Sequence, residues 1–253
     1  MVTNQNLNHF LDFFMRSNEI DDASLNGLQV EGKKEIHKII TGVSANLSLF
    51  KKAESLKADA VLVHHGLFWK GMDFRLNGYL KKRVEILLRN QINLFAYHLP
   101  LDCHETVGNN ISLLNLFQTE NIAPFGYYHG NPIGFQGDLK ENQTLTEILG
   151  FLEDKLEQKA VKAYPFGKEK IKNISVVSGG ASSILYEAIK KKTDLFITGE
   201  LTEYTQELCR ETGLNYIALG HYSSEKLGVQ NLSREIQKNF ECEIEFIDIK
   251  NDF

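Results

Sequence analysis

The chain has 253 residues, of which 42% are hydrophobic and 24% charged, and its formal net charge is −5. This composition is typical of a folded globular protein and excludes extensive disorder, because there is enough apolar material for a sizeable core. The small negative charge argues against an extended basic surface for nucleic acid. At about 150 residues per domain, the length predicts one large or two small domains.

The cysteines and the apolar runs bear on location. Cys103, Cys209 and Cys242 are too few and too scattered for a disulfide scaffold, and none forms a CxxC pair. This usage is typical of the reducing cytoplasm, which is the location we expect. The first residues lack the features of a signal peptide, and no apolar run approaches the roughly 20 residues of a membrane span. We therefore expect no membrane partner.

Helical and strand patterns alternate from the beginning of the chain. Apolar residues at helical spacing predict a helix over residues 4–17, and a strand pattern follows at residues 36–43. A second helix is predicted at residues 46–57, with Asn46 as its cap. The short apolar run at residues 59–63 is typical of a buried parallel strand.

The same alternation continues beyond these elements. Residues 79–90 predict a basic amphipathic helix, and residues 92–97 predict another buried strand. The polar, glycine-rich residues 126–144 predict loops with an edge hairpin, and residues 145–159 return to helix. This order indicates an α/β protein with mostly parallel sheets.

The second half of the chain repeats the pattern of the first. Residues 171–200 match residues 36–65 in their order of strand, turn, lysine-rich helix, aspartate and buried strand. Residues 215–225 match residues 93–102 with one inserted residue. A duplicated α/β unit is the interpretation that we favour.

The alignment of the two halves places Asp59 on Asp194. We therefore expect two pseudo-symmetric α/β units related by duplication, residues 1–125 and residues 126–253. We expect the functional site to lie between them.

Histidines and carboxylates follow three of the predicted strands. They are His64 and His65, then His98 and Asp102, then His221 and Glu225. In parallel α/β sheets, ligands bind at the carboxyl ends of strands. Imidazole and carboxylate together suit Zn, Fe, Mn, Co or Ni ions. A cap or a core position explains any one of these residues, but the three segments together predict a metal site.

The paired histidines favour two ions over one. On an extended strand, His64 and His65 point to opposite sides, so one ion on each is the easier arrangement. Gly66 would allow the chain to leave strand geometry instead. Asp102 and Glu225 would bridge two ions and balance their charge.

A proline, a tryptophan and a glycine-rich turn lie near these residues or in the second half of the chain. Pro100 argues against a regular helix between His98 and Asp102, so we expect these two to meet through a loop. Trp69 either stacks on a planar substrate or simply packs against neighbouring side chains. The Ser-Gly-Gly-Ala turn at residues 178–181 either binds an anion or is a tight turn.

At these motifs the chain resembles a known family, the Nif-three-like dinuclear metal-centre proteins, also called GTP cyclohydrolase 1 type 2 homologs. The resemblance covers nearly the whole chain. It is carried by LNGLQVEG at 25–32, VHHGLFW at 63–69, AYHLPLD at 96–102, GEL at 199–201 and GHYSSE at 220–225.

The resemblance implies a set of site residues. The metal ligands would be His64, His65, Asp102, His221 and Glu225. His98 lies at the position of an active-site histidine, as a ligand or as a donor to one. The resemblance also implies two divalent ions per chain and a ring-shaped homohexamer whose metal pairs face an internal cavity. Many members carry a large insert in mid-chain that is absent here, so we expect no function that belongs to the insert.

Two functions fit the predicted site. In the first, two ions activate water in a hydrolase that acts on a nucleotide or a related small molecule. His98 would then move a proton, and Glu200 would take part at the rim of the site. In the second, the same ligands serve a non-catalytic metal-storage, metal-delivery or regulatory ring protein that binds a protein partner. An open coordination position for water favours the first.

Overall fold

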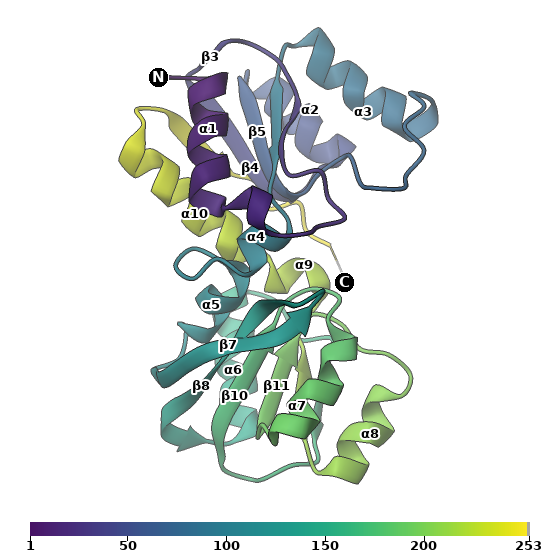
Figure 1. Ribbon diagram of the computed structural model, residues 1–253, viewed down its shortest axis with the longest axis vertical. Helices are drawn as coiled ribbons and strands as arrows, with labels where there is room; N and C mark the ends of the chain where they lie inside the picture. The colour runs from purple at the N-terminus through teal and green to yellow at the C-terminus, as the bar shows by residue number, and fades with distance from the viewer. Residues whose placement is uncertain (252–253) are drawn as a thin grey trace. The chain divides into compact units, whose positions relative to one another are not determined.

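The computed structural model describes residues 1–251, which fold into two compact units (Figure 1). The first unit comprises Met1–Gly108 and Gly228–Lys250, and the second comprises Asn109–Leu227 together with Asn251. We expected one boundary at residue 125, whereas the first unit ends at Gly108 and the chain returns to it at Gly228. Helices and strands alternate in both units, which confirms the α/β prediction.

A five-stranded sheet forms the centre of the first unit, in the order β13-β4-β5-β6-β2. Its strands are β2 (Gly27–Val30), β4 (Lys38–Ser44), β5 (Ala60–His65), β6 (Asn93–Ala96) and β13 (Glu243–Phe246). All neighbours are parallel except β2, which pairs antiparallel with β6. The carboxyl ends of β5 and β6 therefore lie side by side; β5 ends in His64 and His65, and His98 follows β6.

Helices cover both faces of this sheet (Figure 1). They are α1 (Asn4–Met15), α2 (Leu47–Ser55), α3 (Gly78–Arg89) and α10 (Lys226–Asn239). Val61 and Val63 of β5 pack with α2 and α3, whereas Leu62 packs with α1 and α10, as strand alternation requires. The predicted cap is confirmed, since Asn46 Oδ1 accepts the N–H of Leu49 at 2.9 Å. Two short strands, β1 (Val2–Thr3) and β3 (Glu35–Ile36), pair beside the sheet, and a 3-10 turn spans Ser17–Glu19.

The second unit has a six-stranded sheet in the order β7-β8-β10-β11-β12-β9. Its strands are β7 (Thr119–Tyr128), β8 (Asn131–Gln143), β9 (Lys162–Pro165), β10 (Ile171–Val177), β11 (Leu195–Thr198) and β12 (Asn215–Ala218). Only the three central strands β10, β11 and β12 are parallel to one another. The prediction of a mostly parallel sheet is therefore wrong for this unit. The polar stretch expected to hold loops and an edge hairpin is part of the long antiparallel hairpin β7–β8.

Five helices belong to the described part of the second unit. They are α5 (Asn109–Leu114), α6 (Leu145–Leu156), α7 (Leu185–Lys191), α8 (Thr205–Thr212) and α9 (His221–Ser224), and a 3-10 turn at Ser182–Ile184 precedes α7. Residues of α5 and α6 share one apolar core with β8, β10, β11 and β12. Figure 1 shows α7 on the opposite face of the sheet from α6. A capping box at Thr144 and Glu147 fixes where α6 begins.

A buried aspartate anchors the start of the central strands in the first unit. One oxygen of Asp59 accepts the N–H groups of His37 at 2.9 Å and Lys38 at 3.2 Å, and the other accepts from Lys33 Nζ at 2.8 Å. Asn93 donates to the carbonyls of Lys33 and Asp59. Burial alone would raise the pKa of the Asp59 carboxyl, but the Lys33 and backbone hydrogen bonds hold it below its ordinary value.

The second unit contains the same arrangement. Asp194 accepts the N–H groups of Lys172 at 3.0 Å and Asn173 at 3.1 Å, and Lys168 Nζ lies 2.7 Å from its other oxygen. Asn215 donates to the carbonyl of Lys168. Burial and these hydrogen bonds act on the pKa of Asp194 as on that of Asp59, and the net result is again a lowered value. Lys168, Lys172, Asn173 and Asp194 each stand 135 positions after their counterparts in the first unit, whereas Asn215 stands 122 positions after Asn93.

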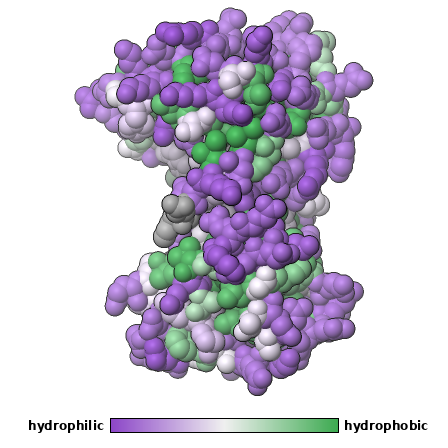
Figure 2. Space-filling view, turned by 180° about the vertical axis from the view of Figure 1, so that it is seen from behind, coloured by the Kyte–Doolittle hydropathy of each residue, from purple (hydrophilic) through white to green (hydrophobic). Residues whose placement is uncertain are grey.

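The surface of each unit is mostly hydrophilic in the view of Figure 2. Hydrophobic residues show between the hydrophilic ones. Within residues 1–251, no helix has the length and apolar character that crossing a membrane would need.

Candidate metal centre

The end of β5 supplies the most deeply buried candidate ligand. The His64 side chain is fully buried, and its Nδ1 lies 3.0 Å from the carbonyl oxygen of Tyr97. Because a carbonyl only accepts, Nδ1 carries the proton and Nε2 presents the lone pair. That Nε2 lies 3.6 Å from Oδ1 of Asp102. An imidazole nitrogen and a carboxylate oxygen therefore face one another at a separation that suits a shared cation.

His65 is the last residue of β5, and its ring lies beside that of His64. The two ring centroids are 4.5 Å apart, so strand alternation does not separate the histidines as the sequence suggested. Nδ1 of His65 lies 3.0 Å from the hydroxyl of Ser44, which is its partner in the β4–β5 ladder. The pairing of β4 with β5 thus orients the second imidazole.

His98 follows β6 and is the N-cap residue of the short helix α4 (Leu99–Asp102). The prediction of a loop between His98 and Asp102 is wrong, because Pro100 stands in the first turn of α4, where its missing N–H costs no hydrogen bond. The N–H of Asp102 donates to the carbonyl of His98 at 3.1 Å. One helical turn therefore sets the position of the carboxylate relative to the histidine.

The His98 ring lies next to the paired histidines. One ligand nitrogen from each of His64, His65 and His98 lies within 4.8 Å of the others. Nδ1 of His98 contacts Oδ1 of Asp22 at 2.8 Å, and its backbone N–H donates to Oδ1 of Asn26 at 2.8 Å. We call His64, His65, His98 and Asp102 the first-unit group.

A side chain of β2 holds the loop that follows His65. Oε1 of Gln29 accepts the N–H of Leu67 at 2.7 Å and that of Phe68 at 3.3 Å. A side chain at Gly66 would overlap the Gln29 amide, so glycine is required there. Gln29 and the Asn26 that bonds His98 both belong to the first motif of the resemblance, to which the sequence assigned no ligand.

Sequence reasoning missed the residues that support the first-unit group. Asp22 and Ser44 contact imidazole rings, whereas Asn26 and Gln29 accept backbone N–H groups next to the histidines. The motif at 25–32 was a signal for Asn26 and Gln29. Nothing in the local sequence indicated Asp22 or Ser44.

The second unit presents a histidine between two carboxylates. His221 begins α9, and its Nδ1 lies 2.6 Å from Oε1 of Glu200 while its Nε2 lies 3.3 Å from Oε2 of Glu225. Burial would lower the pKa of His221, but the hydrogen bonds and charges of Glu225 and Glu200 outweigh it and raise the pKa to about 9. We call His221, Glu225 and Glu200 the second-unit group.

Glycines make room for the second-unit group. Gly179 has φ +63°, and a Cβ there would overlap Oε1 of Glu225. Gly199 aligns with His64 of the first unit, and a Cβ there would lie 2.9 Å from the Cα of His221. The N–H of Gly179 donates to the Ser224 hydroxyl at 3.0 Å. Because the amide is used internally, the structure favours the tight-turn interpretation of residues 178–181 over an anion site.

Trp69 packs on the histidines of the first-unit group. Its indole N–H donates to the carbonyl of Gly66 at 3.1 Å. Its ring meets His98 edge-on, with centroids 4.9 Å apart and an interplanar angle of 72°, and lies 6.1 Å from His65. Trp69 therefore restricts the His98 ring from one side.

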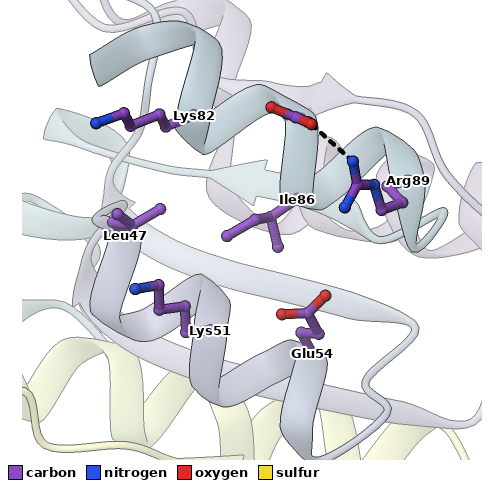
Figure 3. A pocket seen from close by; sticks show the side chains of 7 residues that line it. Leu47, Lys51, Glu54, Lys82, Ile86 and Arg89 are labelled. Atoms are coloured by element: carbon purple, nitrogen blue, oxygen red, sulfur yellow. Dashed lines mark hydrogen bonds and ion pairs between the residues drawn. The ribbon is translucent and has the colours of Figure 1, made fainter. Parts of the chain in front are cut away.

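The donor chemistry of both groups fits divalent metal ions. Each of the four histidines has an oxygen atom at its Nδ1, which is the usual arrangement around metal-bound imidazoles. By contrast, a groove between α2 and α3 is lined by lysine, arginine and glutamate side chains around Leu47 and Ile86, and no histidine lines it (Figure 3). The first-unit and second-unit groups are therefore the candidate metal-binding groups.

Comparison with known proteins agrees with the predicted resemblance. A family model described as Duf34/NIF3 (NGG1p interacting factor 3) matches residues 2–252. A relative from Pyrococcus horikoshii, named GTP cyclohydrolase 1 type 2 homolog, is 43% identical over 239 residues, which are 94% of this chain and 95% of the relative.

Solved structures show the same fold. A structure described as protein ybgI, of unknown function, is 36% identical with a TM-score of 0.94, and each chain is covered completely. The crystal structure of TTHA1606 from Thermus thermophilus is 32% identical with a TM-score of 0.92, again over both whole chains. By sequence and by fold, the chain belongs to the Duf34/NIF3 family.

Proposed function

We propose that the chain is a metal-dependent hydrolase that binds two divalent ions and acts on a nucleotide or a related small molecule. The proposed ligands are His64, His65, Asp102, His221 and Glu225. The observation that carries the proposal is the oxygen atom at Nδ1 of every histidine in the two groups, which leaves Nε2 as the nitrogen that can face a cation. Zn, Fe, Mn, Co and Ni all suit this donor set.

The chain's own residues would bind, orient and move protons. When bound, the ions would supply Lewis-acid chemistry and lower the pKa of water. His98, with Nδ1 held by Asp22 and a side chain about one-fifth exposed, has Nε2 available to accept a proton from the attacking water. Glu200 keeps the His221 ring in place through Nδ1.

A non-catalytic metal-storage, metal-delivery or regulatory protein that binds a protein partner is the second candidate. The complete burial of the His64 side chain favours it, because closed sites hold metal without admitting substrate. The partial exposure of His98 favours the hydrolase instead.

Assembly and location form part of the same proposal. We propose a homohexameric ring in the cytoplasm, and light scattering of the purified protein would measure the assembly. The three free cysteines, Cys103, Cys209 and Cys242, support a reducing compartment. Duplication of one unit is supported by the matching contacts of Asp59 and Asp194.

Metal content tests the site. We expect close to two divalent ions per wild-type chain by elemental analysis, and fewer in His65→Ala and Asp102→Ala. His37→Ala is the matched control, because the His37 side chain is exposed and lies outside both groups. Unchanged content in both site variants would refute the assignment.

A substrate screen tests the activity. Metal-loaded protein should turn over GTP, another nucleotide or a phosphodiester, and His98→Ala should reduce kcat by about 100-fold or more if His98 moves the proton. Absence of turnover with every substrate, together with a stable protein complex recovered from extract, would favour the second candidate.

A further inference from the structure

Asp22 is a buried carboxylate at the edge of the first-unit group. Only 5% of the residue is exposed, yet neither oxygen lacks hydrogen bonds. Oδ1 accepts the N–H of Ser24 at 3.0 Å and faces Nδ1 of His98 at 2.8 Å. Oδ2 accepts from the side chain of Asn26 at 3.0 Å and from the N–H of Leu99 at 2.9 Å. Four donors therefore converge on one carboxylate.

Those contacts keep Asp22 ionised. Burial alone would raise the pKa of the carboxyl, but the hydrogen bonds and the charge interaction with His98 outweigh it, so the pKa falls to about 2. An ionised carboxylate can only accept hydrogen bonds. Nδ1 of His98 must therefore carry a proton, and a neutral His98 must present its lone pair at Nε2.

Asp22 also fixes the backbone next to the His98 ring. Its Oδ2 accepts the N–H of Leu99, the first residue of α4, and Asn26 joins Asp22 to the N–H of His98. The ring and the main chain of His98 are thus fixed together by two side chains from one short segment. A carboxylate that only capped α4 would not need to meet the imidazole as well.

We propose that Asp22 is a positioning residue, which holds His98 in the tautomer that presents Nε2 to His64 and His65. This inference rests on the proposed metal function, in which His98 acts at the metal centre as a ligand or as a proton acceptor. Asp22 acts through His98 and contacts neither the ions nor the substrate. The pairing resembles the carboxylate–histidine arrangements that orient ligands at metal sites in general.

Nitrogen NMR of the metal-free protein tests the tautomer directly. At mildly alkaline pH, the wild-type His98 should show a proton on Nδ1 and none on Nε2. In Asp22→Asn, the amide can donate to Nδ1, so the Nε2-protonated form should appear. Asp21→Asn is the matched control, because Asp21 is exposed and its salt bridge with Lys70 lies on the surface. A wild-type His98 protonated on Nε2 would overturn the inference even if Asp22→Asn did not fold.

Zinc titration tests whether this orientation matters for binding. Asp22→Asn should bind Zn²⁺ about 10- to 100-fold more weakly than wild type, and Asp21→Asn should bind it equally well. In a His98→Ala background, adding Asp22→Asn should cause no further loss, because Asp22 acts through His98. If Asp22→Asn weakens Zn²⁺ binding as much in the His98→Ala background as in the wild type, Asp22 has a structural role and the inference is overturned. Failure of wild type to bind metal would refute the proposed function, while the NMR result would still decide the role of Asp22.

Discussion

Gly179 shows how one missing side chain shapes the candidate centre. Its φ of +63° is strained for any residue with a Cβ, and that Cβ would overlap the Glu225 carboxylate. We predict that Gly179→Ala destabilises the fold by about 1 kcal/mol or more and lowers the metal content by displacing Glu225. Elemental analysis and urea unfolding would measure the two effects.

The neighbouring glycine provides the control for this change. A Cβ on Gly180 would have its nearest atom in Glu200, at 3.4 Å, which is an ordinary contact. Gly180→Ala should therefore keep its metal. Equal metal content in both variants would show that Glu225 does not depend on Gly179.

At the level of single residues, the sequence predicted contacts between residues close in the chain but not contacts between residues far apart in it. The cap at Asn46 was predictable because it bonds an N–H three residues away. His64 and His65 were predictable as candidates because they follow a recognisable buried strand. Asp22 was not, because it meets His98 across 76 positions and only the folded sheet brings the two together.

Among the elements, the aspartates that bond to the starts of β4 and β10 make a pH-dependent contribution to stability. The pKa of Asp59 is lowered in the folded protein, so its stabilisation is complete above the unfolded value of about 3.9 and is lost as pH falls through the folded pKa. We predict that Asp59→Asn is about 2 to 3 kcal/mol less stable than wild type at pH 7. Urea unfolding at neutral and acid pH should show this difference shrinking below about pH 4.

Two further variants provide a matched comparison and a control for that experiment. Asp194→Asn should behave as Asp59→Asn does, because its carboxylate accepts the equivalent backbone N–H groups. Asp73→Asn should leave stability almost unchanged, since Asp73 pairs with Arg75 on the exposed surface. A stability difference for Asp59→Asn that stays constant with pH would contradict the prediction.

The elements that sequence reasoning misjudged have identifiable causes. Pro100 disfavours helix interiors, yet the first turn of α4 tolerates it, and a four-residue helix is too short to show periodicity. The hairpin β7–β8 lies at the edge of its sheet, where many polar residues are exposed and buried glycines interrupt the apolar positions, so the strand pattern is hidden. Buried central strands such as β5 and β11 were readable, because both of their faces are apolar.

For the molecule as a whole, metal binding should be visible as added stability. A ligand that binds only the folded state stabilises it by about 4 kcal/mol at a thousand times its Kd. We predict that Zn²⁺ or Mn²⁺ raises the Tm of wild type, that a chelator reverses the rise, and that His65→Ala loses most of it. Thermal scans would measure these shifts, with His37→Ala as the control; an undiminished shift in His65→Ala would place the binding elsewhere.

The division into two units was foreseeable, but the membership of the last residues was not. The repeated order of strand, helix and strand indicated two halves of similar design. The return of residues 228–250 to the first unit depends on β13 pairing in parallel with β4, which joins Lys38 to Glu243 across 205 positions. Short strands that pair over such distances carry no local signal of their partner.

This return also determines the order in which the cores can be completed during synthesis. The first unit begins at the first residue, but its sheet needs β13 and its core needs Val229, Leu232 and Ile236 from α10. The second unit is almost entirely one continuous stretch, Asn109–Leu227. On the ribosome, the unit that begins later therefore has its core residues available first. The earlier unit must keep part of its apolar sheet uncovered until the final helix and strand have emerged.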